Sequence, residues 1–179
     1  FGENDLLERE ASYGRSGFAL QFMLDTSISD SDKHPLKLRD LIVMSVDNDT
    51  APEKVVWTND MDKALNDLPC VGLIGDKYYG PMRYQGGDWL PYEASVMSID
   101  PAGRGKDETS YAVGKMLHSC IYVTEAGGLM GGYNEETLEA LVRTAKRNRV
   151  NMVLIESNFG DGMFKALIEP YFAREYPVT

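Results

Sequence analysis

The sequence predicts an α/β domain with a mixed sheet and flanking helices, preceded by a less regular accessory region. Three observations predict it. Two short apolar runs, at residues 95–100 and 150–155, each lead directly into a carboxylate, Asp100 and Glu156. Further apolar segments of strand length lie between them, and a helical pattern precedes the second run. The resulting order, three strands, a helix, a strand and a helix, contains one strand–helix–strand crossover, the unit that makes two strands parallel.

The first 93 residues carry weaker signals. Residues 3–24 have helical apolar spacing that is interrupted by Gly14 and Gly17, so two short helices are expected there. The Ser- and Asp-rich residues 25–35 are expected to form a loop or linker. Strands are expected in three apolar or aromatic stretches, at residues 41–46, 55–57 and 77–84.

From residue 94 onward the pattern is clearer. Four strands are expected, near residues 95–100, 109–117, 119–125 and 150–155. Asn134 is a favourable N-cap for a helix that ends near Asn148, and acids occupy its first turn. A glycine-rich loop is expected over residues 127–132. A second helix is expected over residues 160–174, bent or broken at Pro170 because proline cannot donate a backbone hydrogen bond.

The order of these elements resembles that of the ribonuclease-H-like nuclease fold. In that fold the first and fourth strands lie side by side, so Asp100 and Glu156 would stand at neighbouring strand ends. A carboxylate at a strand end is held rigidly, and Mg²⁺ prefers hard oxygen ligands in a fixed geometry. The two acids therefore predict one shared metal site.

Composition limits the class of protein. The chain has 179 residues, is 43% hydrophobic and 26% charged, and carries a net charge of −10. These values are typical of an ordinary globular protein, and the negative charge argues against a protein that simply coats nucleic acid. The two cysteines, Cys70 and Cys120, lack the spacing of a metal or redox motif, and free thiols are expected, although a disulfide between them stays open.

A local basic cluster lies in the last turns of the first predicted helix of this region and directly after it. It consists of Arg143, Lys146, Arg147 and Arg149. Contacts with phosphate groups are one interpretation. Complementing the helix dipole at a solvated helix end is an equally good one.

Two segments resemble the nuclease domain of the large terminase subunit of tailed bacteriophages, the DNA-packaging motor and headful-cutting enzyme. They are residues 98–109, SIDPAGRGKDET, and residues 155–164, IESNFGDGMF. The resemblance extends over residues 94–175. Asp100 matches the first catalytic acid of the family, and Glu156 matches the second.

The resemblance implies a division of the chain into three regions. They are the end of an ATPase module and a linker at 1–35, accessory strands leading into the nuclease at 36–93, and a C-terminally incomplete ribonuclease-H-like nuclease domain at 94–179. Residues 17–25 resemble the segment where the ATPase module of the family meets the linker. The phosphate-loop signature GxxxxGK[ST] does not occur, since Gly105-Lys106 is followed by Asp107, so the ATPase activity of the parent protein is not encoded here.

The activity that the resemblance implies is metal-dependent endonuclease cleavage of concatemeric double-stranded DNA during genome packaging, a hydrolase acting on phosphodiester bonds. Two divalent ions, Mg²⁺ or Mn²⁺, would activate water and stabilise the leaving oxygen. Asp100 would be shared between the ions and Glu156 would hold one. The family takes a third catalytic Asp from a later helix, which we expect after Thr179, so this fragment is expected to bind metal weakly and to cut poorly.

Four further residues are second candidates. Asp107 and Asp161 could add metal contacts, or Asp107 could order its loop and Asp161 could cap the following helix. Arg104 and Lys106 could contact a DNA phosphate, or be solvated loop charges. For each of them the structural interpretation is at least as good as the functional one.

Partners implied for the parent protein are double-stranded DNA, the portal, the small terminase subunit and other large subunits, in the host cell cytoplasm and with no membrane. Two other interpretations stay open. One is half of an actin-like-fold sugar or acyl kinase, whose phosphate loop also follows an acidic strand end. The other is a non-catalytic docking module, which suits the acidic residues 1–94. Metal held between Asp100 and Glu156 without nucleotide would favour the nuclease over the kinase.

Overall fold

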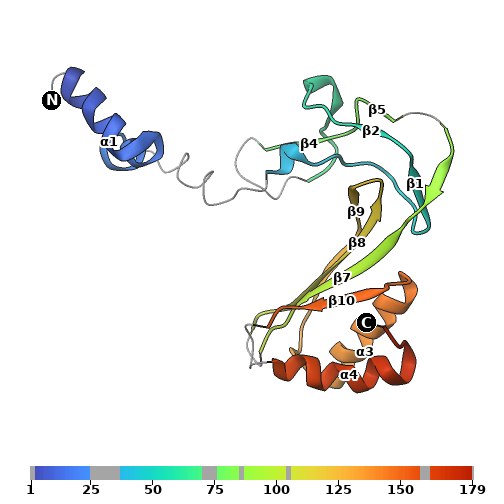
Figure 1. Ribbon diagram of the computed structural model, residues 1–179. Helices are drawn as coiled ribbons and strands as arrows, with labels where there is room; N and C mark the ends of the chain where they lie inside the picture. The colour runs from blue at the N-terminus through green and yellow to red at the C-terminus, as the bar shows by residue number, and fades with distance from the viewer. Residues whose placement is uncertain are drawn as a thin grey trace. The chain divides into compact units, whose positions relative to one another are not determined.

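The computed structural model in Figure 1 describes residues 3–24, 37–69, 76–84, 87–103, 106–157 and 162–178. The chain folds into two units. The first comprises Phe1–Val43 and Trp57–Met82, and the second comprises Met44–Val56 and Arg83–Thr179. Among the described residues no helix is long and apolar enough to span a bilayer. The three regions expected from the sequence, with boundaries after residues 35 and 93, remain a prediction.

The first unit begins with α1 (Glu3–Phe22), one helical run that bends. The guanidinium carbon of Arg9 lies 5.4 Å from the ring centre of Phe22. A straight helix would separate the Cα atoms of these residues by about 20 Å, more than both side chains can bridge. The sequence predicts two helices here because Gly14 and Gly17 weaken the middle of the run. The helix instead continues through them and bends.

The remaining elements of the first unit are short. They are the 3₁₀ turns η1 (Leu38–Asp40) and η2 (Met61–Lys63) and the antiparallel strands β3 (Ala64–Leu65) and β4 (Tyr78–Tyr79). The strand expected at residues 41–46 is wrong, since only Ile42 forms a bridge, to Tyr79. A two-residue partner strand offers too few backbone groups to support a longer ladder. The strand expected at residues 77–84 is likewise divided, because the chain leaves β4 before pairing again.

Two short antiparallel ribbons open the second unit. They pair β1 (Thr50–Pro52) with β6 (Trp89–Pro91) and β2 (Val55–Val56) with β5 (Arg83–Tyr84). Side chains of the main sheet reach this region: the Lys115 ammonium donates to the Asn48 carbonyl, and the Tyr122 hydroxyl donates to the Pro52 carbonyl. Lys115 is only 3% exposed, and this burial lowers its pKa from the ordinary lysine value.

The main sheet has four strands in the order β10-β7-β8-β9. Its strands are β7 (Ala94–Asp100), β8 (Thr109–Leu117), β9 (Cys120–Leu129) and β10 (Met152–Ile155). The first three are antiparallel neighbours, whereas β10 runs parallel to β7. All four expected strands are therefore confirmed, and so is the adjacency of the first and the fourth.

The strand β9 is longer than expected. Gly127 and Gly128, predicted to lie in a loop, pair with Tyr111 and Ser110 of β8. Side chains from the β8 side lie over these two glycines, so closely that a Cβ atom at Gly128 would stand 2.1 Å from a carboxylate oxygen of Glu108. The two glycines are therefore part of the strand and do not end it. Because they have no side chain, neighbouring side chains can lie over them.

Two helices pack on one face of this sheet: α3 (Glu135–Arg147) and α4 (Met163–Glu175) (Figure 1). Asn134 caps α3 as predicted, since its side chain accepts a hydrogen bond from the Thr137 amide at 2.8 Å. Of the two alternatives predicted for Pro170, a bend or a break, the break is wrong. The helix continues past it because buried side chains anchor both halves to the core. The core residues from the sheet and the helices are Met97, Ile99, Val113, Leu138, Leu141, Val142, Ala145, Val150, Phe164, Ile168 and Phe172.

The opposite face of the sheet carries exposed apolar side chains. Its members are Met116, Ile121, Val123, Met152 and Leu154, which are 40–72% exposed. Strand register places all of them on the face away from α3 and α4.

The turn between β8 and β9 is a two-residue loop of His118 and Ser119. Both residues have positive φ, +48° and +66°. A two-residue hairpin turn of this kind favours Asn-Gly, because left-handed backbone is unfavourable for other L-residues.

Replacing the turn residues should therefore stabilise the protein. We expect the double substitution His118→Asn, Ser119→Gly to raise the free energy of unfolding by about 1 kcal/mol, because it removes unfavourable left-handed conformations. The half-exposed contact of His118 with Glu93, at 3.6 Å, is too weak to offset this. Urea unfolding measures the change, with Ser119→Ala as the control that relieves no strain. A double variant less stable than the parent would contradict the argument.

Candidate active site

Asp100 and Glu156 stand at the same end and on the same face of the sheet. Ile155 of β10 pairs with Ile99 of β7, and the Glu156 amide donates to the Ile99 carbonyl at 3.0 Å, so the parallel register continues to the acid. Because Ile99 is fully buried toward the helices, its neighbour Asp100 projects from the helix-free face, and Glu156 does the same. The sequence-based prediction that the two acids follow adjacent parallel strands is confirmed.

The two carboxyl groups interact directly. The pKa of Glu156 is raised above its ordinary value, first by the negative charge of Asp100 and then by a side-chain hydrogen bond with Asp100. Burial contributes least, since both side chains are exposed to solvent. Two carboxylates this close cannot both ionise freely. A nearby cation would relieve this repulsion.

Small side chains surround Asp100 on the helix-free face. Ser110 lies directly opposite Asp100 on β8, and Ala112 lies opposite Ser98. Gly128 of β9 lies beside Ser110 in turn. The residues beside Asp100 on this face are therefore small.

Glu108 is an acid that sequence reasoning missed. Its side chain lies over Gly128, at the same end and on the same face as Asp100. Glu108 lies two residues before Ser110, and in an extended chain this spacing places both side chains on the same side. That spacing is the sequence signal that could have identified Glu108. Among the described residues, however, no three His, Cys, Asp or Glu side chains gather closely enough to hold a metal ion.

The second candidates are less well placed. Asp107 and Lys106 are exposed in the segment before β8. Arg104 and Asp161 lie outside the described residues. The N-cap position of α4 is taken by Gly162, at a φ of +88°.

The basic cluster has structural partners. Arg143 pairs with Glu139 at 3.3 Å, and Arg149 pairs with Asp49 at 2.9 Å. Arg147 pairs with a carboxylate at the edge of the sheet, that of Glu125. These pairs favour the helix-end interpretation of the cluster over a phosphate-binding one.

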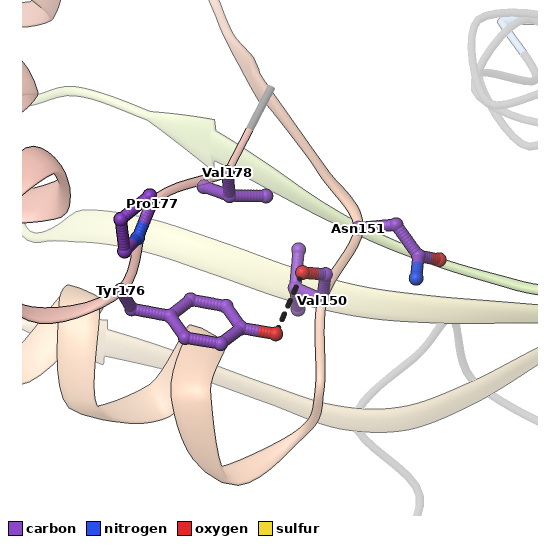
Figure 2. A pocket seen from close by; sticks show the side chains of 5 residues that line it. All are labelled: Val150, Asn151, Tyr176, Pro177 and Val178. Carbon is purple, nitrogen blue, oxygen red and sulfur yellow. Dashed lines mark hydrogen bonds between the residues drawn. The ribbon is translucent and has the colours of Figure 1, made fainter.

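A shallow hollow lies at the other end of β10 (Figure 2). It is lined by Val150, Asn151, Tyr176, Pro177 and Val178, and the Tyr176 hydroxyl donates to the Val150 carbonyl at 3.0 Å. The hollow precedes the first residue of the strand, whereas Glu156 follows its last. It is therefore separate from the acid pair.

Comparison with known proteins agrees with this arrangement. A family model described as the ribonuclease H-like domain of the bacteriophage T7 terminase matches residues 99–179. The chain is also 44% identical to the terminase large subunit of Enterobacteria phage T3, in an alignment that covers 98% of this chain. The chain spans 30% of the length of that relative.

The contact between Asp100 and Glu156 predicts how the stability of the protein depends on pH. Replacing Asp100 by Asn should lower the pKa of Glu156 toward its ordinary value, because the neighbouring charge is removed. In the parent chain the raised pKa means that the folded state binds this proton more tightly than the unfolded chain, so stability falls as pH rises through that pKa. The variant should lose this fall, and be more stable than the parent at neutral pH without metal.

Carbon-detected NMR titration of the Glu156 carboxyl, with unfolding curves between pH 4 and 7, measures both effects. Asp107→Asn is the matched control and should leave the titration of Glu156 unchanged. An equal shift in both variants would mean that Asp107 belongs to the same charged group.

Proposed function

We propose that the chain is the nuclease region of a terminase large subunit, because residues 99–179 match the model of the ribonuclease H-like domain of the bacteriophage T7 terminase and the chain is similar to a phage terminase large subunit. It would act as an endonuclease on double-stranded DNA during genome packaging. The observation that carries the proposal is the contact between Asp100 and Glu156 at the ends of two adjacent parallel strands. The match to a terminase family also favours this hypothesis over the kinase one.

The donor groups fit a hard divalent cation. Asp100 and Glu156 supply oxygen ligands, and the raised pKa of Glu156 reflects a repulsion that a cation would relieve. Both side chains are exposed, which leaves room for water and for a phosphate group. We propose that Asp100 and Glu156 would hold divalent ions, Mg²⁺ or Mn²⁺, with two ions expected in the complete site. Bound ions of this kind supply Lewis-acid stabilisation of charge on phosphoryl oxygens.

Small residues next to Asp100 suit the approach of a duplex. Ser98 and Ser110, which lie beside Asp100 on the sheet, are small side chains next to which the backbone of a DNA strand would lie. Hydrolysis would form a bond between a water oxygen and phosphorus and break the bond from phosphorus to the 3′ oxygen, which takes a proton. Because the chain would contact phosphates and not base edges, cleavage should show no base specificity. Arg104 and Lys106 are the proposed phosphate contacts from the loop.

The site is proposed to be completed by a third acid. The family takes this Asp from a later helix, which we place after Thr179, with Asp107 and Asp161 as the candidates within this chain. As part of a longer terminase, residues 1–35 would end the ATPase module and residues 36–93 would lead into the nuclease. The portal, the small subunit and other large subunits would then be its partners, in the cytoplasm of the host cell.

Loss of Asp100 should abolish cleavage. Plasmid nicking in Mn²⁺ should fall by at least about a hundredfold in Asp100→Ala, because removing a metal ligand costs several kcal/mol of transition-state stabilisation and each ~1.4 kcal/mol is tenfold in rate. Asp62→Ala, which removes an exposed acid in the other unit, should cut like the parent. Parent-like cleavage by Asp100→Ala would refute the assignment.

The proposed third acid gives a separate prediction. Residues 1–179 alone should bind Mn²⁺ weakly, more tightly than Mg²⁺, and should nick plasmid more slowly than a chain that continues past Thr179. With few protein anions, water must fill the remaining ligand positions, and ions held this way exchange readily. Nicking assays on the two chains decide the matter. Equal cleavage would place the third acid within this chain, with Asp107 and Asp161 the first to mutate.

A further inference from the structure

A buried hydroxyl group holds the loop that follows Asp100. Thr109 is 0% exposed. Its Oγ1 accepts a hydrogen bond from the Ala102 amide at 3.0 Å, and its hydroxyl donates to the Gly132 carbonyl at 3.2 Å. One side chain therefore joins the loop after β7 to the loop between β9 and α3, two segments that are distant in the sequence.

The second segment also packs directly on the first. Gly132 has a φ of +58°, and a Cβ atom on it would stand 2.3 Å from the carbonyl oxygen of Gly103. No other residue fits this position, because the contact is with backbone that cannot turn aside and the φ is left-handed. Pro101 and Ala102, which precede Gly103, are buried. The loop is thus held from two directions.

We call the Thr109 hydrogen bonds and the packing of Gly132 on Gly103 the brace. The brace lies close to the acid pair. Ala102 lies two residues after Asp100, and Thr109 immediately precedes Ser110, which pairs with Asp100 across the strands. Asp100 is therefore held by strand pairing on one side and by the brace on the other. Glu156, by contrast, is placed by β10. The distance between the two carboxylates depends on both supports.

We infer that Thr109 and Gly132 are positioning residues that set the place of the Asp100 carboxylate relative to Glu156, and through it the affinity of the site for a divalent cation. The inference rests on the proposed function, since it assumes that the acid pair binds a cation. A cation site tolerates little displacement of its ligands, and losing a supporting hydrogen bond weakens metal binding by about 10–100-fold. A purely structural Thr109 would alter the melting temperature but not the metal affinity of the folded protein.

The test compares three substitutions in the 179-residue chain. Thr109→Val keeps the shape of the side chain and removes the hydroxyl, whereas Thr109→Ser keeps the hydroxyl. Thr124→Val is the matched control, because the Thr124 hydroxyl is buried and finds no partner among the described residues. The dissociation constant for Mn²⁺ is measured from the electron paramagnetic resonance signal of the free ion, well below each melting temperature. Hydrogen exchange of the Ala102 amide reports on the brace itself.

Thr109→Val should raise the Mn²⁺ dissociation constant about tenfold and expose the Ala102 amide to exchange. Thr109→Ser and Thr124→Val should stay close to the parent in both measurements. Should Thr109→Val not fold, Thr109→Ala replaces it, with the same expectation.

The outcomes distinguish a failure of the positioning role from a failure of the proposed function. If the parent chain binds Mn²⁺ and Thr109→Val binds it equally well after losing protection at Ala102, the inference is overturned and the proposed function stands. If Thr109→Ser weakens binding as much as Thr109→Val, the hydroxyl is not responsible, and the inference is also overturned. If the parent and Asp100→Asn are equally unable to bind Mn²⁺, the proposed function itself fails, and the positioning role fails with it.

Discussion

The parallel pairing of β10 with β7 is the constraint on which the candidate site depends. It brings Glu156 into register with Asp100 and turns both acids to the face without helices. Because side chains alternate along a strand, a slip of one residue would turn Glu156 toward the core and leave a charge there. The register is maintained by Val153 and Ile155, which pack against the core from the same strand.

Glu125, another carboxylate of this unit, differs from Asp100 and Glu156 in the groups that it contacts. Glu125 accepts hydrogen bonds from Tyr111, Arg147 and Asn148, and so ties the last turn of α3 to the edge of the sheet. Such an acid meets cationic and polar groups of the protein and serves stability. Asp100 and Glu156 instead meet each other. An arrangement that costs stability without a ligand is characteristic of functional sites.

The sequence predicts the main sheet well because its signals are local. An apolar run that ends in an acid marks a buried strand, and Asn134 marks the start of a helix by its own hydrogen bond. Continuation of α4 through Pro170 was not predictable, since core packing on both sides outweighs one lost hydrogen bond. The brace through Thr109 was missed for a similar reason. A buried threonine and a glycine have ordinary local patterns, and only the tertiary structure shows that they meet. Whether Asp100 and Glu156 are catalytic remains a prediction.

The sheet order also has a consequence for how the protein folds. The hairpins β7-β8 and β8-β9 join neighbours in the chain, so they can close early, whereas β10 must return across both the hairpins and α3 to reach β7. During synthesis Asp100 leaves the ribosome well before Glu156. A nascent chain therefore carries the first acid in a nearly finished sheet without its partner. The acid pair would therefore assemble only after the β7-β8-β9 hairpins have formed.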